Sequence, residues 1–200
     1  MVTMKNKLRQ HLEKSTALTD KEWGVLSSRL REQYLQRSSI LSSAGRPSEA
    51  MHFVVKGSVR SFINRDEGEI TWNFYFPDGI ATDFQSFLTG EPSPLDFETL
   101  EDTLLITLDK QSLPDMYKEA PELIRFENLF ARRAFLDMRQ RMESFLLQSA
   151  EERYLNFLNR HPDIVSSLPG SYIATYLGLT PQSLSRSEER RVGKECRSRW

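Results

Sequence analysis

Cysteine is nearly absent from this chain of 200 residues, which contains a single one, Cys196, close to its C-terminus. Disulfides and thiolate zinc sites need more than one cysteine, so neither these nor cysteine-ligated iron–sulfur clusters are expected. The chain also lacks an apolar run of about 18 residues and any signal-peptide pattern. We therefore expect a cytoplasmic protein that has no contact with a membrane.

Basic residues are missing from the middle of the chain. From Asp66 through Asp109 there are eleven Asp and Glu residues, but neither a lysine nor an arginine. An anionic ligand bound to this segment would meet electrostatic repulsion without a counter-charge from it.

The motifs of catalysis and metal binding are missing as well. The chain contains no G-x-S-x-G elbow, no glycine-rich phosphate loop and no His-x-x-x-His spacing. His52 is the only histidine within a predicted strand, and a lone strand histidine is usually structural. We expect no catalytic residue, no bound metal and no cofactor, and thus a protein that is not an enzyme.

Two kinds of secondary structure are predicted before residue 110. Residues 1–36 favour amphipathic helices, one of them capped by Thr19 or Asp20 and extending to Leu30. From about Tyr34 onward, short apolar runs alternate with turn residues, which is typical of a small antiparallel sandwich or barrel. The predicted strands are residues 51–55, 59–63, 70–76, 97–100 and 103–108.

A long helix is predicted over residues 121–150, because apolar positions recur there at alternating spacings of four and three. This heptad pattern is the signature of a parallel coiled coil, and it predicts a homodimer. A single helix buried against its own domain is the alternative. The predicted dimer seam consists of Ile124, Asn128, Ala131, Phe135, Met138, Met142 and Phe145.

The segment Gly170–Arg186 is predicted to form a DNA-binding helix-turn-helix. Ile173 and Leu177 lie on one helical face, Gly178 can adopt the left-handed conformation that ends a helix, and Thr180 can cap a second helix. A plain helical hairpin is the alternative interpretation. Leu184 would turn back onto the first helix, while the predicted DNA-contacting residues are Pro181, Gln182, Ser183 and Arg186.

The residues that follow do not continue the apolar pattern, since Ser187 and Glu188 stand where apolar residues are expected after Leu184. Arg186–Trp200 matches, codon by codon, the translation of a common sequencing adapter, so we interpret the tail as non-native. A native basic tail that contacts DNA phosphates is the alternative. Without residues 187–200, the chain has 22 Lys and Arg against 25 Asp and Glu, a net charge of −3.

In this order of segments the chain resembles the bacterial Crp/Fnr regulators, named for the cAMP receptor protein and the fumarate–nitrate reductase regulator. The resemblance is strongest in EERYLNFL (Glu151–Leu158) and IATYLGLTPQSLSR (Ile173–Arg186). It implies an α+β fold: an antiparallel β-roll of the cyclic-nucleotide-binding type, a dimerisation helix and a winged helix-turn-helix. It also implies a homodimer that binds palindromic DNA, with RNA polymerase as a further partner.

The resemblance locates an effector pocket, but this chain departs from the family there. The family's Gly-Glu-Leu corresponds to Thr82, Asp83 and Phe84, and its phosphate-binding Arg corresponds to Ser93. With the anchor replaced inside an acidic segment, we expect that cAMP and cGMP do not bind, and the effector is left open. In the recognition helix, Pro181 and Gln182 replace the family's Arg-Glu, so the DNA target should differ.

These observations predict four segments: a sensing domain (1–118), the dimerisation helix (119–148), a partial helix-turn-helix (149–186) and a non-native tail (187–200). The predicted function is DNA-binding transcription regulation. The alternative is a dimeric ligand-sensing or protein-interaction module without DNA binding. For the chain as printed we expect no sequence-specific DNA affinity, because about one turn of recognition helix cannot span a half-site.

Overall fold

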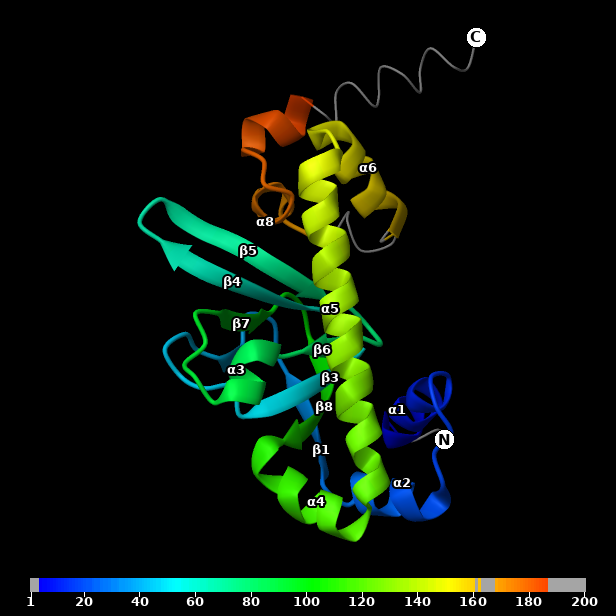
Figure 1. The fold of residues 1–200 in the computed structure, drawn as a ribbon. Coiled ribbons are helices and arrows are strands. Elements are labelled where there is room, and N and C mark those ends of the chain that lie inside the picture. The colour runs from blue at the N-terminus through cyan, green and yellow to red at the C-terminus, as the bar shows by residue number, and fades with distance from the viewer. Residues whose placement is uncertain (1–3, 161, 163–167, 187–200) are drawn as a thin grey trace. The chain divides into compact units, whose positions relative to one another are not determined.

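The computed structural model describes residues 4–160, 162 and 168–186 of the chain. It is an α+β protein in which strands are followed by a long helix and a group of shorter helices (Figure 1). Two compact units are distinguished. The first comprises the described residues up to 63 together with 72–134, and the second comprises residues 64–71 together with the described residues from 135 onward.

Two helices precede the strands along the chain, one short helix lies between β6 and β7, and the remaining helices follow the last strand. The strands are β1 (Leu30–Leu35), β2 (Ile40–Ser42), β3 (Ala50–Lys56), β4 (Val59–Arg65), β5 (Gly68–Tyr75), β6 (Ile80–Ala81), β7 (Asp96–Thr99) and β8 (Thr103–Asp109). The helices are α1 (Met4–Glu13), α2 (Asp20–Ser27), α3 (Phe84–Thr89), α4 (Leu113–Glu119), α5 (Ile124–Leu147), α6 (Ala150–Arg160) and α8 (Gly170–Tyr176). Short 3-10 helices occupy Lys110–Ser112 and Pro121–Leu123, and a last helix occupies residues 181–186.

The strands form two antiparallel four-stranded sheets with the orders β1-β8-β3-β6 and β2-β7-β4-β5. One core lies between the sheets, where Val54 and Leu105 of the first sheet join Val59 and Phe97 of the second. Each of these side chains is at most 2% exposed. The small antiparallel sandwich predicted from the spacing of strands and turns is confirmed, and so is the β-roll that the resemblance implied.

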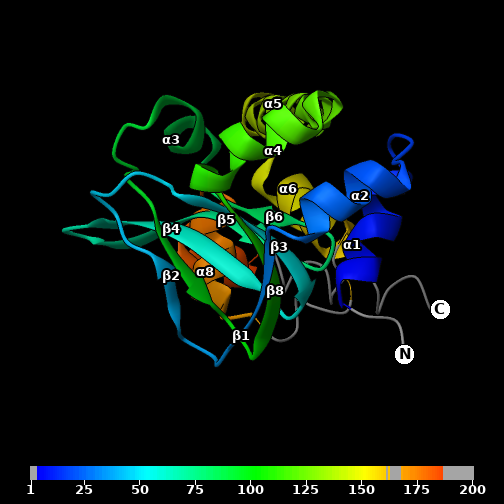
Figure 2. The same cartoon turned by 90° about the horizontal axis from the view of Figure 1, so that it is seen from below.

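A second core covers the other face of the first sheet. Side chains alternate between the two faces of a strand, so Phe53 and Ile106, the neighbours of Val54 and Leu105, point away from the inter-sheet core. They pack with Leu12 and other residues of α1, α2, α4 and the start of α5. Figure 2 shows these helices beside the sheet that contains β3 and β8.

The tight turn between β3 and β4 requires glycine. Gly57 has a φ of +89°, and a Cβ atom added there would lie 2.5 Å from Thr103 Oγ1. Other residues would be strained by the backbone conformation and would clash with β8.

The prediction for the N-terminal helices is partly wrong. Thr19 caps α2 through a capping box with Glu22, as the sequence suggested, but α2 ends at Ser27. Leu30 lies in β1 instead, opposite Leu108 of β8. The helical pattern misled because Leu30 satisfies both a helical spacing and the start of a strand, and pairing with β8 decided between them.

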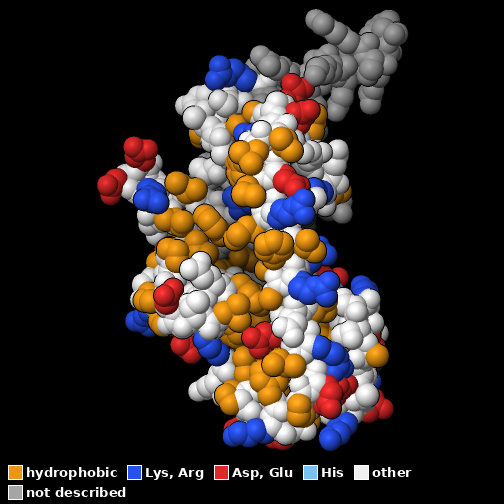
Figure 3. Space-filling model, in the orientation of Figure 1, with side chains coloured by type: hydrophobic (Ala, Val, Ile, Leu, Met, Phe, Trp, Pro, Cys, Tyr) orange, Lys and Arg blue, Asp and Glu red, His pale blue; other side chains and the backbone are white. Residues whose placement is uncertain are grey.

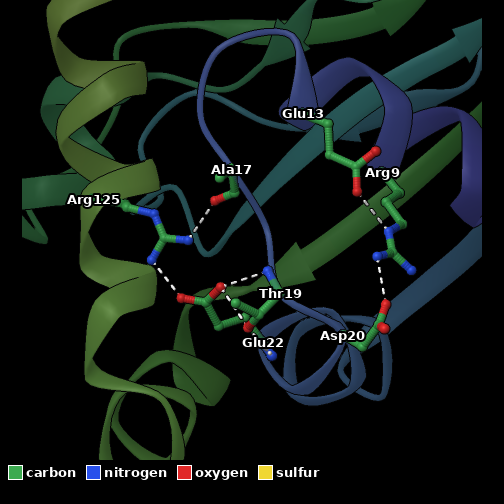
Figure 4. A network of polar contacts seen from close by, with 7 residues as sticks. All are labelled: Arg9, Glu13, Ala17, Thr19, Asp20, Glu22 and Arg125. Carbon is green, nitrogen blue, oxygen red and sulfur yellow. Dashed lines mark hydrogen bonds and ion pairs between the residues drawn. The ribbon is translucent and has the colours of Figure 1, made fainter.

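A polar network ties α5 to the segment before α2 (Figure 4). Arg125 donates to Glu22 Oε1 at 2.6 Å and to the backbone carbonyl of Ala17 at 2.8 Å. The hydrogen bond from Arg125 and the one from the backbone of Thr19 lower the pKa of Glu22 to about 2.

Within the described residues, no helix is both long enough and apolar enough to span a lipid bilayer.

Candidate functional site

The segment Gly170–Arg186 forms two short helices joined by a turn, as its residues predict. Ile173, Ala174 and Leu177 are buried, and Gly178 adopts a left-handed φ of +67°. The N–H of Leu179 closes the turn by donating to the carbonyl of Ala174 at 2.8 Å. A helix end of this kind needs a residue without a Cβ penalty, so glycine is the natural choice.

The second helix begins at Pro181, as expected. Thr180 caps it, since Thr180 Oγ1 accepts a hydrogen bond from the N–H of Ser183 at 3.2 Å. Leu184 is only 3% exposed and therefore turns inward.

The predicted DNA-contacting residues lie on the outer side of this helix. Pro181, Gln182 and Arg186 are exposed and Ser183 is half-buried. The Arg186 guanidinium lies over the helix, where it donates to the Gln182 carbonyl at 3.3 Å and to Ser183 Oγ at 3.4 Å. The four residues form one polar surface that carries an amide, a hydroxyl and a cation.

Arginine and phenylalanine side chains that the sequence reasoning missed support the turn from behind. Arg153 of α6 donates to the carbonyl of Leu177 at 3.0 Å and to that of Gln148 at 2.8 Å. Arg153 thus links the C-terminal end of α8 to the end of α5, where carbonyl groups lack helical partners. Phe145 packs so close to the turn that a Cβ atom on Gly178 would lie 2.8 Å from its ring.

The tip of the β4–β5 hairpin also belongs to this unit. The backbone N–H of Thr71 donates to Thr175 Oγ1 of α8 at 3.1 Å, and Thr71 is fully buried. No local pattern indicates this contact, because the two threonines are 104 positions apart.

The predicted dimer seam lies on α5 and is largely exposed. Hydrophobic side chains gather along this helix in Figure 3. Phe135 is 68% exposed, Met138 63% and Met142 57%, values far above those of core residues. Ile124, Asn128 and Phe145 are exposed too, and Ala131 is half-buried. Phe145 additionally contacts Gly178, so it does not serve the seam alone.

The predicted effector-pocket residues are brought together with one exception. Asp83 caps α3 by accepting from the N–H of Ser86 at 3.3 Å, and Ser93 Oγ donates to the other Asp83 oxygen at 2.7 Å. Thr82 Oγ1 lies 3.0 Å from Ser48 Oγ, a residue that the sequence reasoning missed. Phe84 instead packs against the core between the first sheet and the helices.

The electrostatics of this pocket differ from those of a phosphate site. The donors at the start of α3 and Ser93 Oγ already serve the carboxylate of Asp83. Arg60 on β4 is fully buried, but it is committed to Glu98 at 2.6 Å and stacks on the ring of Phe62. One further cation, Arg46, lines a groove of about 260 Å³ beside Ser48.

His52 is held inside the β-roll by a hydrogen-bond chain across three strands. Its Nδ1 lies 2.9 Å from Thr107 Oγ1, which donates to Gln33 Oε1 at 2.6 Å. Burial lowers the pKa of His52 to about 4, so the ring is neutral at pH 7. In the part of the chain that the structure describes, no group of three or more His, Cys, Asp or Glu side chains is placed to hold a metal ion.

Known proteins share the sequence pattern of the strand region and the fold of most of this chain. Residues 32–120 match the family model described as the cyclic nucleotide-binding domain. FixK2 from Bradyrhizobium japonicum is similar in structure, with a TM-score of 0.71 and 20% identity over 83% of this chain and 86% of that one. A putative Crp/Fnr regulator from Eubacterium rectale gives 0.70 and 19%, over 88% and 85% of the two chains. The chain has the Crp/Fnr fold.

The Crp/Fnr fold also relates the chain to the catabolite activator protein of Thermus thermophilus, with a TM-score of 0.55 and 16% identity over 90% of this chain and 86% of that one. No curated protein sequence matches. At these identities, the structural matches establish the architecture, and the function has to be argued from the site.

Proposed function

We propose that this protein is a DNA-binding transcription regulator of the Crp/Fnr type rather than an enzyme. The observation that carries the proposal is the pair of helices joined at Gly178, with Leu184 turned inward and Pro181, Gln182 and Arg186 exposed. A second helix with a polar outer side, set by a tight turn against a first helix, is the arrangement that enters a DNA major groove.

Dimerisation through α5 is part of the proposal. The helix exposes aromatic and methionine side chains at heptad spacing, and an apolar surface of this kind is costly to leave in water. A two-fold dimer would present two recognition helices to a palindromic site, and RNA polymerase is then a further expected partner of the bound regulator.

We also propose that residues 187–200, which lie outside the described residues, are not native. Sequence-specific DNA binding then belongs to the chain with its native continuation, because the helix of residues 181–186 covers fewer than two turns. Resequencing across codon 186 tests this proposal, and a native reading frame through Trp200 would refute it.

The DNA-binding proposal is tested with the native continuation restored. Binding duplexes are selected from a randomised pool, and affinity is then measured by fluorescence anisotropy at physiological salt. Replacing Gln182 with Ala should weaken binding about tenfold and relax preference at its contacted base, whereas Lys21→Ala, an exposed cation on α2, should leave affinity unchanged. If no duplex is selected, the DNA-binding proposal is refuted and the alternative, a sensing module without DNA binding, replaces it.

We further propose that the β-roll does not bind cAMP or cGMP. Ser93 stands where the phosphate-binding arginine is expected, and the carboxylate of Asp83 already takes the hydrogen bonds of Ser86 and Ser93. A cyclic phosphodiester would have to displace a like charge from its own donors.

A further inference from the structure

A cavity of about 60 Å³ lies in the second core, between the first sheet and the helices around it. Its floor is formed by Phe53 and Ile106, and its walls include Leu12 of α1, Met116 of α4 and Phe126 of α5. These strand residues face away from the inter-sheet core, so the cavity is separate from the pocket around Asp83.

The cavity is almost entirely apolar, but it has one polar pair in its wall. The hydroxyl of Tyr117 donates to Glu127 Oε2 at 2.6 Å, and both residues line the space. Burial, together with this hydrogen bond, raises the pKa of Tyr117, which keeps the phenol protonated as a donor. A carboxylate has further lone pairs, so Glu127 can accept an additional hydrogen bond from a molecule in the cavity.

We propose that this cavity binds a small uncharged molecule with a short aliphatic body and a single hydroxyl group that donates to Glu127. The apolar walls and the Glu127 carboxylate exclude an anion, and a cation would find only Glu127 to replace its lost hydration. The volume admits only a few carbon atoms, and the flexible side chains of Met51 and Met116 allow the walls to adapt to the ligand.

A ligand in the cavity would contact helix α5. Leu123, Phe126 and Phe130 line the cavity at the start of α5 and in the 3-10 helix before it. A ligand that fills the space adds contacts to this end of the helix and stabilises the folded form that binds it. The site would therefore connect a small neutral molecule to the element that carries the predicted dimer seam.

The test uses isobutanol as the probe and the whole chain as the protein. Methyl-region NMR should show saturable shifts of the Met51 and Met116 methyl signals, and the thermal midpoint should rise with isobutanol relative to its effect on a control protein. Met116→Phe, which fills the space, should abolish the saturable shifts. Leu88→Phe, at an exposed apolar position on α3, is the matched control and should retain them.

Xenon is the second probe, because it reports any apolar void without hydrogen bonding. Saturable shifts with isobutanol in the unmodified chain support the proposal even if Met116→Phe fails to fold. Shifts with xenon but none with isobutanol would mean a packing void only and would overturn it. Isobutanol binding that persists in a folded Met116→Phe protein would place the ligand elsewhere and would also overturn it.

Discussion

Gly178 combines two requirements at a single backbone position. Its φ of +67° is a conformation that side chains with a Cβ atom rarely adopt, and the Phe145 ring occupies the space where that Cβ would lie. The first requirement could be predicted from the apolar pattern around Leu177. The second depends on the position of Phe145, 33 residues earlier in the chain.

Gly178→Ala should therefore destabilise the second unit by about 2 kcal/mol or more, from backbone strain and overlap together. A double-mutant cycle separates the two causes. In a Phe145→Ala background, the cost of Gly178→Ala should fall to that of the strained backbone alone, about 1–2 kcal/mol. Urea unfolding of the four proteins gives the values, and equal costs in both backgrounds would disprove the contact.

His52 makes the stability of the β-roll depend on pH. The folded protein lowers the pKa of this ring to about 4, below the ordinary 6.5, so the unfolded chain binds more protons between these values. Stability should then fall as the pH decreases from 6.5 toward 4, by at most about 3 kcal/mol.

His52→Gln keeps a hydrogen-bonding side chain beside Thr107 but removes the titration. Denaturant unfolding at pH 7 and pH 4.5 should show a smaller difference for this variant than for the unmodified protein. Glu22, whose pKa falls from 4.5 to about 2 in the folded protein, changes the stability mainly below pH 4.5 and does so equally in both proteins. The same pH slope in both proteins would show that another group is responsible.

At the scale of the element, α5 exposes more hydrophobic surface than is usual for a helix that faces only solvent. Phe135, Met138 and Met142 are each more than half exposed. The heptad spacing predicted a helix here, and the structure confirms it as Ile124–Leu147. That a second copy of the chain covers this surface is a prediction.

A charge placed in the seam should prevent association. Met138→Glu should shift the protein from dimer to monomer in sedimentation equilibrium, because two carboxylates would face each other in an apolar interface. Gln140→Glu adds the same charge two residues away, on the side of the helix opposite to the seam, and should leave the dimer intact. A monomer at tens of micromolar for the unmodified chain would contradict the whole seam.

At the scale of the whole molecule, charge distribution distinguishes this β-roll from a phosphate-binding one. The acidic residues from Asp66 through Asp109 have no basic residue among them, and Arg60 of the neighbouring strand is paired with Glu98. Arg46, in the groove beside Ser48, is the cation that sequence reasoning did not weigh.

Calorimetric titration with cAMP or cGMP should accordingly show no binding at micromolar concentrations. Asp83→Asn removes the like charge while keeping a side chain that can cap α3, and it should not create a micromolar site because the cation is still missing. A micromolar dissociation constant that is lost in Arg46→Ala would overturn the proposal and identify Arg46 as the anchor.

Much of the architecture was predictable because it depends on local periodicity. A short apolar run ending at a glycine predicted the strand around Val54, alternation predicted the strand that begins at Val59, and heptad spacing predicted α5. The boundary of α2 at Ser27 and the strand at Leu30 were not predictable in this way, because pairing with β8 overrides the local helical pattern. Strand β2 and helix α3 are short, so they leave little periodic signal.

The sequence by itself determined the order of segments, the turn at Gly178, the outward positions of Gln182 and Arg186, and the acidity of the β-roll, since each depends on neighbours in the chain. Only the tertiary structure decided which residues far apart in the sequence come into contact. It brought Ser93 to Asp83, Arg153 to Leu177 and Tyr117 to the wall of a cavity, because packing and hydrogen bonding between distant segments have no counterpart in local sequence pattern.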